Sequence, residues 1–496
     1  MTNKILKYSG ALLLIFSLVF SGCKKLDDMK MNRDPTKPTT SEPQYLLTGA
    51  QKSAMDILYS GLQNGYIAMH YAQFWSGNSR FVDSQYQLDE GNNTALWNNL
   101  YRISLHNLNE LIEKNYAKLG EPGIANQSAI AQIMRAWIFQ VLVDTYGNVP
   151  YSEAFKNVTT ITPKYDDAKT IYNSLLDTLQ AQIQVLDSSQ TSFNTGDIIY
   201  KGDVESWRRL GHSLMLRMAI RMVDADPAKA KQIIEANYQG AFTGNDQTAQ
   251  FQYLDAAPNK YPQNESERAI IGFSVSTTLV DYMAGLHDPR LPLYVRPAKH
   301  DGAYRGLPYG WSTSDPLHQS EDYYSFPGTQ MYSATMPAVL MGYPEVEFIL
   351  AEAAARGMNV GDAATHYSNG IKASMTYWRD LTGKAIPDDS IQAYIDRVPY
   401  VAADWRNVIG TQKWLALYPQ GFQAWFERTR LKFKKPGGTP LFVLPKSGIL
   451  DNTVKEVPLR LTYPIIEQTQ NKANYDEAAS AIGGDTKGTA LWYNKF

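Results

Sequence analysis

The segment QSAIAQIMRAWIFQVLVDTYGNVPYS, residues 127–152, carries the strongest structural signal in the chain. Within it an apolar side chain recurs every three or four residues, at Ile130, Met134, Trp137 and Val141. This spacing predicts an amphipathic helix over residues 127–146. The pair Gly147-Asn148 is typical of a helix C-cap, and residues 149–152 then continue as an extended turn.

The same periodicity returns along the rest of the chain and predicts a mostly helical protein. We expect helices over residues 43–62, 94–113, 165–186, 203–223, 276–286, 343–356, 361–381 and 410–433. Because these helices alternate in pairs, they suggest stacked helical hairpins of the tetratricopeptide type. No Gly/Ser linker or charge block divides residues 45–496, so the sequence predicts a single large domain dominated by α-helix.

The middle of this domain, residues 240–341, differs from the rest. Gly, Pro, Asn, Asp and Tyr are dense there, and helical rhythm fades except over residues 276–286. Long irregular segments in compact proteins tend to carry binding functions. We therefore expect a loop-rich insertion that contributes to a ligand-binding surface.

The N-terminus predicts export and a lipid anchor. Lys4 and Lys7 precede an apolar run over residues 11–20, and the small residues Ser21-Gly22 precede Cys23, the only cysteine of the chain. This order is that of a signal peptide over residues 1–22, and residues 19–23 resemble a bacterial lipobox that would leave Cys23 lipidated. The alternative for Cys23 is an inert, unpaired core thiol.

The residues after Cys23 predict a tether. Residues 23–44 are rich in polar residues, Pro and Thr, which predicts a flexible, extended segment. The run Lys24 to Asp28 resembles the surface-export signal of Bacteroidota lipoproteins, although a solvated polar tether would have the same composition.

Composition restricts the partners. The 47 basic and 49 acidic residues give a formal net charge of −2, and no basic patch is visible, so nothing indicates a nucleic-acid partner. One cysteine excludes disulfides within the chain, so stability has to come from an extensive apolar core. The 32 tyrosines and 10 tryptophans suit cores, interfaces and sugar-binding surfaces alike.

Two groups of residues have the chemistry that a sugar ligand needs, namely flat aromatic faces for C–H groups and polar groups for hydroxyls. They lie on a first loop and on the middle loop; the candidate ligand-binding residues are Tyr71, Trp75, Asn78 and Arg80, and Tyr309, Trp311, Tyr323 and Tyr324. The alternative for Trp75 is that its ring packs under the neighbouring loop.

Catalytic and metal-binding motifs are missing from the sequence. It has no His-Glu-x-x-His, no Gly-x-Ser-x-Gly and no phosphate-binding Gly-rich loop, which indicates a protein without enzymatic activity or cofactor. Two carboxylates at glycosidase separation could still meet in space. The pairs Asp166-Asp167 and Asp224/Asp226 could touch calcium, but their positions favour helix starts.

Two arginines lie one turn apart on the helix predicted over residues 203–223. Arg217 and Arg221 could together hold an anion, but arginine on an otherwise apolar helix usually needs a structural partner. We expect them to pair with buried acids such as Asp144 or Asp224.

Several motifs, in order along the chain, resemble those of the SusD/RagB family of outer-membrane lipoproteins, especially its SusD-like branch. Residues 146–154 resemble the Gly-Asp-Val-Pro-Tyr turn of that branch, with Asn148 in place of Asp. Residues 207–221 resemble its Trp-containing helix, and residues 345–353 its Glu-Val-x-Phe-x-x-Ala-Glu-Ala helix. Further similarity lies at residues 412–414, 425–430 and 458–471, so the resemblance extends from residue 32 to residue 471.

This resemblance implies a function that composition does not. Such proteins sit on the cell surface, bind oligosaccharides or sometimes peptides, and form a lid over a SusC-like TonB-dependent transporter. We therefore expect a lipid-anchored outer-membrane protein that binds a glycan and has no catalytic activity. A peptide-binding member of the family and a surface glycoside hydrolase are the alternatives.

Overall fold

The structure is a computed structural model that describes residues 41–156, 160–264 and 272–495. The expected signal peptide (residues 1–22), Cys23 and the tether up to residue 40 lie outside the described residues. None of the helices in the described ranges is long and apolar enough to cross a membrane.

The fold is dominated by helices, as predicted. In the first half of the chain they are α2 (Pro43–Leu58), η2 (Gly61–Ala68), α3 (Met69–Tyr71), α4 (Phe81–Ser84), α5 (Glu90–Asn98), η3 (Asn99–Leu105), α6 (His106–Tyr116), α7 (Ile124–Tyr146), α8 (Ala168–Val185), α9 (Val204–Arg221) and α10 (Pro227–Asn237). In the second half they are α11 (Thr277–Gly285), α12 (Leu291–Tyr294), α13 (Tyr343–Ala355), α14 (Ala363–Thr382), α15 (Asp388–Arg397), α16 (Trp405–Ala416), α17 (Gly421–Leu431), α18 (Ile465–Gln470) and α19 (Lys472–Ala481). Single 3-10 turns are η5 (Tyr238–Gly240), η6 (Asn245–Gln247), η7 (Glu321–Tyr323), η8 (Thr329–Tyr332) and η9 (Ala402–Asp404).

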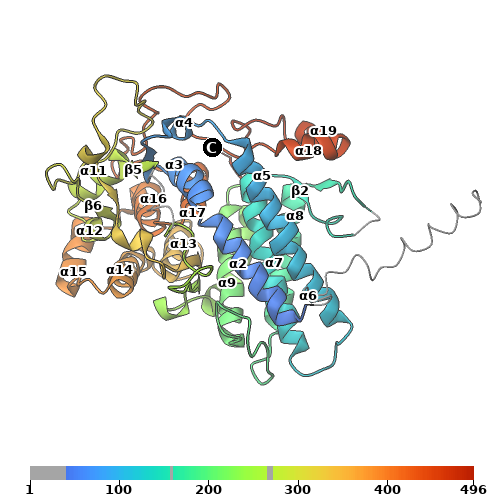
Figure 1. The fold of residues 1–496 in the computed structure, drawn as a ribbon. Helices are drawn as coiled ribbons and strands as arrows, with labels where there is room; N and C mark the ends of the chain where they lie inside the picture. The colour runs from blue at the N-terminus through green and yellow to red at the C-terminus, as the bar shows by residue number, and fades with distance from the viewer. Residues whose placement is uncertain (1–40, 157–159, 265–271, 496) are drawn as a thin grey trace, which may run out of the picture.

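Consecutive helices pack side by side as hairpins. The chain of contacts runs from α2 to α6 and on through α7, α8, α9 and α10, and α13 packs on α14 in the other half (Figure 1). This confirms the tetratricopeptide-like arrangement of one domain. Local sequence signals set the helix ends: Asp167 and Asp203 accept hydrogen bonds at the starts of α8 and α9, and Gly147 ends α7 with a φ of 86°.

One predicted helix is wrong. Residues 410–433 were expected to form a single helix, but the structure divides them between α16 and α17. Pro419 lies between the two helices, and proline has no N–H to donate and clashes with the preceding turn of a helix. The apolar pattern continues on both sides of Pro419, and for this reason periodicity alone did not reveal the break.

Short strands occur as antiparallel pairs. They are β1 (Trp75–Gly77) with β5 (Phe273–Val275), β2 (Val149–Pro150) with β3 (Tyr165–Asp166), β4 (Ala249–Phe251) with β8 (Ala338–Met341), and β6 (Val295–Arg296) with β7 (Phe326–Pro327). Six of these eight strands lie in the loop-rich region or pair with it: β4–β8 and β6–β7 are internal to that region, and β1–β5 joins it to the first loop.

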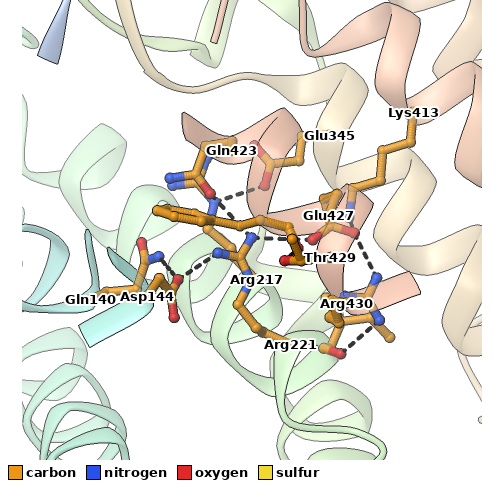
Figure 2. A network of polar contacts seen from close by, with 12 residues as sticks. Gln140, Asp144, Arg217, Arg221, Glu345, Lys413, Gln423, Glu427, Thr429 and Arg430 are labelled. Carbon is orange, nitrogen blue, oxygen red and sulfur yellow. Dashed lines mark hydrogen bonds and ion pairs between the residues drawn. The ribbon is translucent and has the colours of Figure 1, made fainter. Parts of the chain in front are cut away.

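A network of buried ion pairs joins the two halves of the helical scaffold (Figure 2). Arg221 on α9 contacts Asp144 on α7 and lies 3.1 Å from Glu427 on α17. Glu427 also lies 3.0 Å from Lys413 Nζ and 2.6 Å from an Arg430 nitrogen. The predicted pairing of Arg221 with Asp144 is therefore confirmed.

The second arginine of that pair has a different partner. Arg217 binds Glu345 on α13 through two hydrogen bonds of 2.7 and 2.6 Å, and Asp224 binds Arg356 instead. Arg217 and Arg221 are both fully buried. Since each is neutralised by acids of the scaffold, neither is available for a ligand anion.

Candidate functional site

Strand pairing brings the two predicted groups of ligand residues into one region. β1, which carries Trp75, pairs with β5, and the chain after β5 bridges to Leu307 on the middle loop. Ser76 Oγ donates a hydrogen bond to the Pro308 carbonyl (3.2 Å) and accepts one from Gly310 N–H (3.1 Å). The first loop and the middle loop therefore form one continuous surface, although more than two hundred residues separate them in the sequence.

Four of the predicted ligand residues lie beneath this surface. Trp75 is 0 % exposed and its ring stacks on Phe273 with centroids 4.3 Å apart. Asn78 donates a hydrogen bond to Ser274 Oγ (2.8 Å), and Tyr309 donates one to the His70 carbonyl (2.8 Å). Tyr71 is packed against the rings of Tyr86 and Trp425. Because all four side chains are buried, the expectation that they contact a ligand is corrected: they support the loops from below.

Arg80 lies at the edge of the same region with its charge already engaged. Its side chain is half-buried and forms ion pairs with Asp83 (2.9 Å) and Asp89 (3.6 Å). Burial raises the pKa of Asp83 to about 6, although the Arg80 guanidinium lowers it. The guanidinium also lies 4.6 Å from the ring centre of Tyr66. A ligand would reach Arg80 only at the rim.

The other aromatic candidates form a small cluster on the middle loop. Leu307, Trp311 and Tyr324 pack together, with the half-buried Tyr323 against them. The Arg305 guanidinium lies 3.9 Å from the ring centre of Tyr323. These side chains come from two segments of the middle loop, and the cluster is separate from the main core.

Trp311 is held in a fixed orientation and is covered on one face. Its indole N–H donates to Asp315 Oδ2 (2.8 Å), and this hydrogen bond lowers the pKa of the Asp315 carboxyl. Lys446 Nζ lies 3.2 Å from the centre of the indole ring, and Trp311 is 7 % exposed. A ligand that stacks on this ring has to displace the Lys446 side chain.

A groove of about 550 Å³ runs beside Trp311. We call it the Trp311 groove; its lining includes Phe81, Gln85, Ser312, Ser314, Asp315 and Ser447. Ser312 N–H donates to Ser447 Oγ (2.9 Å), and Gln85 Nε2 donates to the Gly310 carbonyl (3.1 Å). Hydroxyl, amide and carboxylate groups beside an aromatic residue are the groups that recognise a polyhydroxylated ligand.

Sequence reasoning missed most of this lining. The sequence analysis does not identify Gln85, Ser312 or Asp315 as ligand residues, nor any residue of the segment around Lys446. The signal that could have pointed to Ser312 and Asp315 is their position directly after Trp311 in the same loop. No local signal links Ser447 or Lys446 to that loop, because their contact depends on long-range backbone pairing of Lys446 and Ser447 with Tyr309 and Gly310.

The acidic pairs considered for calcium have protein partners. Asp167 and Asp226 cap the starts of α8 and α10, as their positions predict. Asp166 accepts hydrogen bonds from Tyr151 N–H and Ser152 N–H. Within the described ranges, no three His, Cys, Asp or Glu side chains gather in a way that could hold a metal ion.

The chain was compared with known proteins. Residues 35–464 match the family model SusD-like_2, described as "Starch-binding associating with outer membrane". A solved structure of a chitin-binding protein is 28% identical, with a TM-score of 0.81, covering 92% of this chain and all of the other. A SusD homologue from Bacteroides thetaiotaomicron is 25% identical, with a TM-score of 0.71, covering 92% of this chain and 100% of its own. A chitin-binding SusD homologue from Flavobacterium johnsoniae is 22% identical, with a TM-score of 0.77, covering 90% and 98%. No curated protein matches the sequence.

Proposed function

The chain belongs to the SusD-like family, whose model is described as starch-binding and associating with the outer membrane, and we propose that it binds oligosaccharides at the Trp311 groove. The proposal places the protein at the cell surface as a lipoprotein anchored through Cys23. There it delivers its ligand to a SusC-like TonB-dependent transporter and acts as the transporter's lid. The binding role rests on the groove, and the anchor and transporter roles rest on the N-terminal sequence and the family resemblance.

The Trp311 groove is the observation that carries the binding role. Its lining contains three serine side chains, the Gln85 amide and the Asp315 carboxylate, and Asp315 accepts a hydrogen bond of 2.8 Å from the neighbouring Trp311 indole. Fixed polar groups bind a ligand with little loss of side-chain freedom. Trp311, the half-buried Tyr323 and Arg80 remain the proposed ligand contacts among the residues predicted from sequence, with Arg80 at the rim. Tyr324 is 2 % exposed, so the expectation that it contacts a ligand is corrected, as for the other buried candidates.

Two of the structural relatives are described as chitin-binding, which makes oligosaccharides of N-acetylglucosamine the first neutral ligands to test. An acetamido group offers one donor and one acceptor, and the serine and amide groups of the Trp311 groove can match both. The starch-binding description of the family adds malto-oligosaccharides to the same panel.

We propose binding without catalysis at this groove. Two-carboxylate glycoside hydrolysis needs a facing pair roughly 5 to 9 Å apart. Among the described lining residues of the Trp311 groove, Asp315 supplies one carboxylate, and its oxygens accept hydrogen bonds from Trp311 (2.8 Å) and Leu317 N–H (2.9 Å). Such a carboxylate is suited to hold a loop and a ligand hydroxyl.

The test is a binding screen of the soluble chain from residue 24 onward. Polysaccharides, chito- and malto-oligosaccharides and peptide mixtures are offered, and the recovered ligands are checked for cleavage. We expect one class of glycan to be retained intact. Retention of peptides alone would replace this function with peptide binding, and cleavage products would replace it with hydrolysis.

The anchor and the partner need a separate test. In cells of a host that processes lipoproteins, Cys23→Ala is expected to release the protein from the membrane fraction, whereas the wild-type chain stays with it. A transporter of the TonB-dependent class is expected to co-purify with the wild-type protein in mild detergent. A Cys23→Ala chain that remains in the membrane fraction would contradict the lipid anchor.

A further inference from the structure

A second and larger groove lies next to the Trp311 groove. Its volume is about 830 Å³, within the range typical of ligand pockets. It lies between the end of α17 and two coil segments that contain Phe442 and Lys455, and we call it the Arg428 groove. Its lining includes the cations Arg428, Lys434 and Lys455. Among the described lining residues Glu456 supplies the one carboxylate.

Arg428 is the most unusual group in this groove. It is 5 % exposed, and no acidic side chain in the described ranges forms an ion pair with it. Its Nη1 donates to the Tyr71 carbonyl (2.6 Å), and its guanidinium lies 4.2 Å from the ring centre of Phe442. The side chain is therefore held in place by a carbonyl and a ring, neither of which neutralises its charge.

A buried guanidinium without an acid is costly unless something neutralises it. Elsewhere in this protein such arginines are paired: Arg217 binds Glu345, Arg290 binds Asp288 and Arg430 binds Glu352, at 2.6 to 2.7 Å. A guanidinium presents planar N–H groups that match carboxylate and sulfate oxygens in a bidentate manner. Within the described ranges, Arg428 is the one buried arginine without an acidic partner, which indicates an anionic partner from outside the chain.

The lysines and the apolar side chains of the Arg428 groove also favour an anionic ligand with an apolar face. Lys434 and Lys455 are exposed on the lining and add positive charge around Arg428. Phe442, Val443 and Leu444 supply an apolar side to the groove. A sugar ring that carries an acidic substituent has this combination, an apolar C–H face and a negative charge.

Neighbouring residues of one segment of the chain line the two grooves. Val443 and Leu444 line the Arg428 groove, whereas Lys446 covers Trp311 and Ser447 lines the Trp311 groove. Leu444 and Lys446 are two residues apart, so their Cα atoms are at most about 7 Å apart. The two grooves therefore lie within the reach of neighbouring units of one saccharide chain.

We propose that the Arg428 groove binds the anionic group of an acidic saccharide, a uronic acid carboxylate or a sugar sulfate, whose neighbouring units lie in the Trp311 groove. The inference rests on the proposed function and names its substrate class. Arg428 is the central anion-binding residue, and Lys434 and Lys455 strengthen the local positive potential. Exposed charges of this kind contribute less at high salt, whereas the buried Arg428 is screened less.

The experiment measures the affinity of the purified mature protein in detergent for four probes. They are oligogalacturonides, chondroitin sulfate oligosaccharides, neutral chito-oligosaccharides of similar length and poly-glutamate. The variants are Arg428→Gln, the double variant Lys434→Gln/Lys455→Gln, and Trp311→Ala. The matched control is Lys118→Gln/Lys384→Gln, which removes the same charge from exposed positions outside both grooves.

We expect at least one acidic saccharide to bind, and both groove variants to weaken it about tenfold or more while the control does not. The galacturonide and the sulfated probe distinguish a carboxylate from a sulfate ligand. Thermal unfolding of each variant shows whether it is folded, and if Arg428→Gln is not, the lysine double variant decides. Unchanged affinity in the folded variants would overturn the proposal.

The remaining outcomes separate this inference from the proposed function. If neutral saccharides bind and Trp311→Ala weakens them, while acidic ones bind no better, the Arg428 groove proposal alone fails. If no saccharide of either kind is retained, the proposed function fails as well. If poly-glutamate binds more tightly than every acidic saccharide and Arg428→Gln abolishes it, the groove is a peptide site and the saccharide proposal is overturned.

Discussion

Arg428 and Arg430 lie two positions apart on α17 and belong to two different regions of the molecule. Because an α-helix turns by about 100° per residue, their side chains leave the helix in nearly opposite directions. Arg430 enters the buried network beside Glu427 (Figure 2). Its guanidinium lies 2.6 Å from Glu427 and 2.6 Å from Glu352. Arg428 faces the groove beside the loops and has a carbonyl and a ring for neighbours.

The fold neutralises the charge of Arg430 with acids and leaves the charge of Arg428 without an acidic partner in the described ranges. In the network, burial raises the pKa of Glu427, but the neighbouring cations Arg430, Lys413 and Arg221 lower it by more, so the pKa of this carboxyl lies well below its ordinary value. In the loop region the cations outnumber the acids at the groove. Changes in the network should therefore alter folding, and changes at the grooves should alter binding.

The largest expected effect is on stability, from Glu427→Gln. This change removes the carboxylate charge that Arg221, Lys413 and Arg430 share in the buried interior. We expect the free energy of unfolding to fall by about 3 to 5 kcal/mol. Urea unfolding followed by circular dichroism measures it.

The control for that change is Glu205→Gln. Glu205 forms ion pairs with Arg208 and Arg209, but its side chain is 45% exposed, so its loss should cost less than about 1 kcal/mol. If the two variants lose similar stability, the buried network is not the element that joins the two halves of the scaffold.

The next effect is on binding, from Trp311→Ala. We expect the affinity for the retained glycan to fall by about 1 to 3 kcal/mol because the aromatic face and the hydrogen bond to Asp315 are lost. Isothermal titration calorimetry measures the affinity, and the unfolding midpoint should stay close to that of the wild type because the Trp311 cluster is separate from the main core. Tyr116→Ala, which removes a 76% exposed ring on α6, is the matched control and should bind normally.

A smaller effect, of opposite sign, is expected from Lys446→Ala. In the free protein the Lys446 ammonium covers the indole at 3.2 Å from its centre, and a stacking ligand has to displace it. Removing that competitor should strengthen glycan binding by about 0.5 to 1 kcal/mol, the size of an exposed cation–π contact. Weaker binding in this variant would mean that Lys446 contacts the ligand directly and does not merely cover the ring.

The scaffold was largely predictable from sequence, and the loop region was not. Hydrophobic periodicity predicts the ends of the long helices α7 and α9 to within a few residues, because one buried face repeats over many turns. The sequence predicts that Trp75 on the first loop contacts a ligand, but pairing of β1 with β5 buries it, and such pairing cannot be recognised in the local sequence. The sequence also could not separate Arg428 from Arg430, because which side of α17 meets acids depends on α13, about eighty residues earlier in the chain.

The smallest expected effect is a pH dependence of the scaffold that leaves binding unchanged. His366 Nδ1 on α14 lies 2.7 Å from Glu347 on α13, and its Nε2 lies 2.9 Å from the Val360 carbonyl oxygen. Burial lowers the pKa of His366, but these two hydrogen bonds raise it by more, so the pKa lies above its ordinary value.

A histidine whose pKa is higher in the folded chain contributes stability that is complete below about pH 6.5 and is lost as the pH rises through the folded-state pKa. The wild type should therefore lose less than about 1 kcal/mol of stability between about pH 6 and pH 8.5 relative to His366→Gln, measured by urea unfolding at both values. Glycan affinity should not differ between the two proteins at either pH, because His366 joins scaffold helices; an affinity difference that follows this titration would show that α13 and α14 are coupled to the loop region after all.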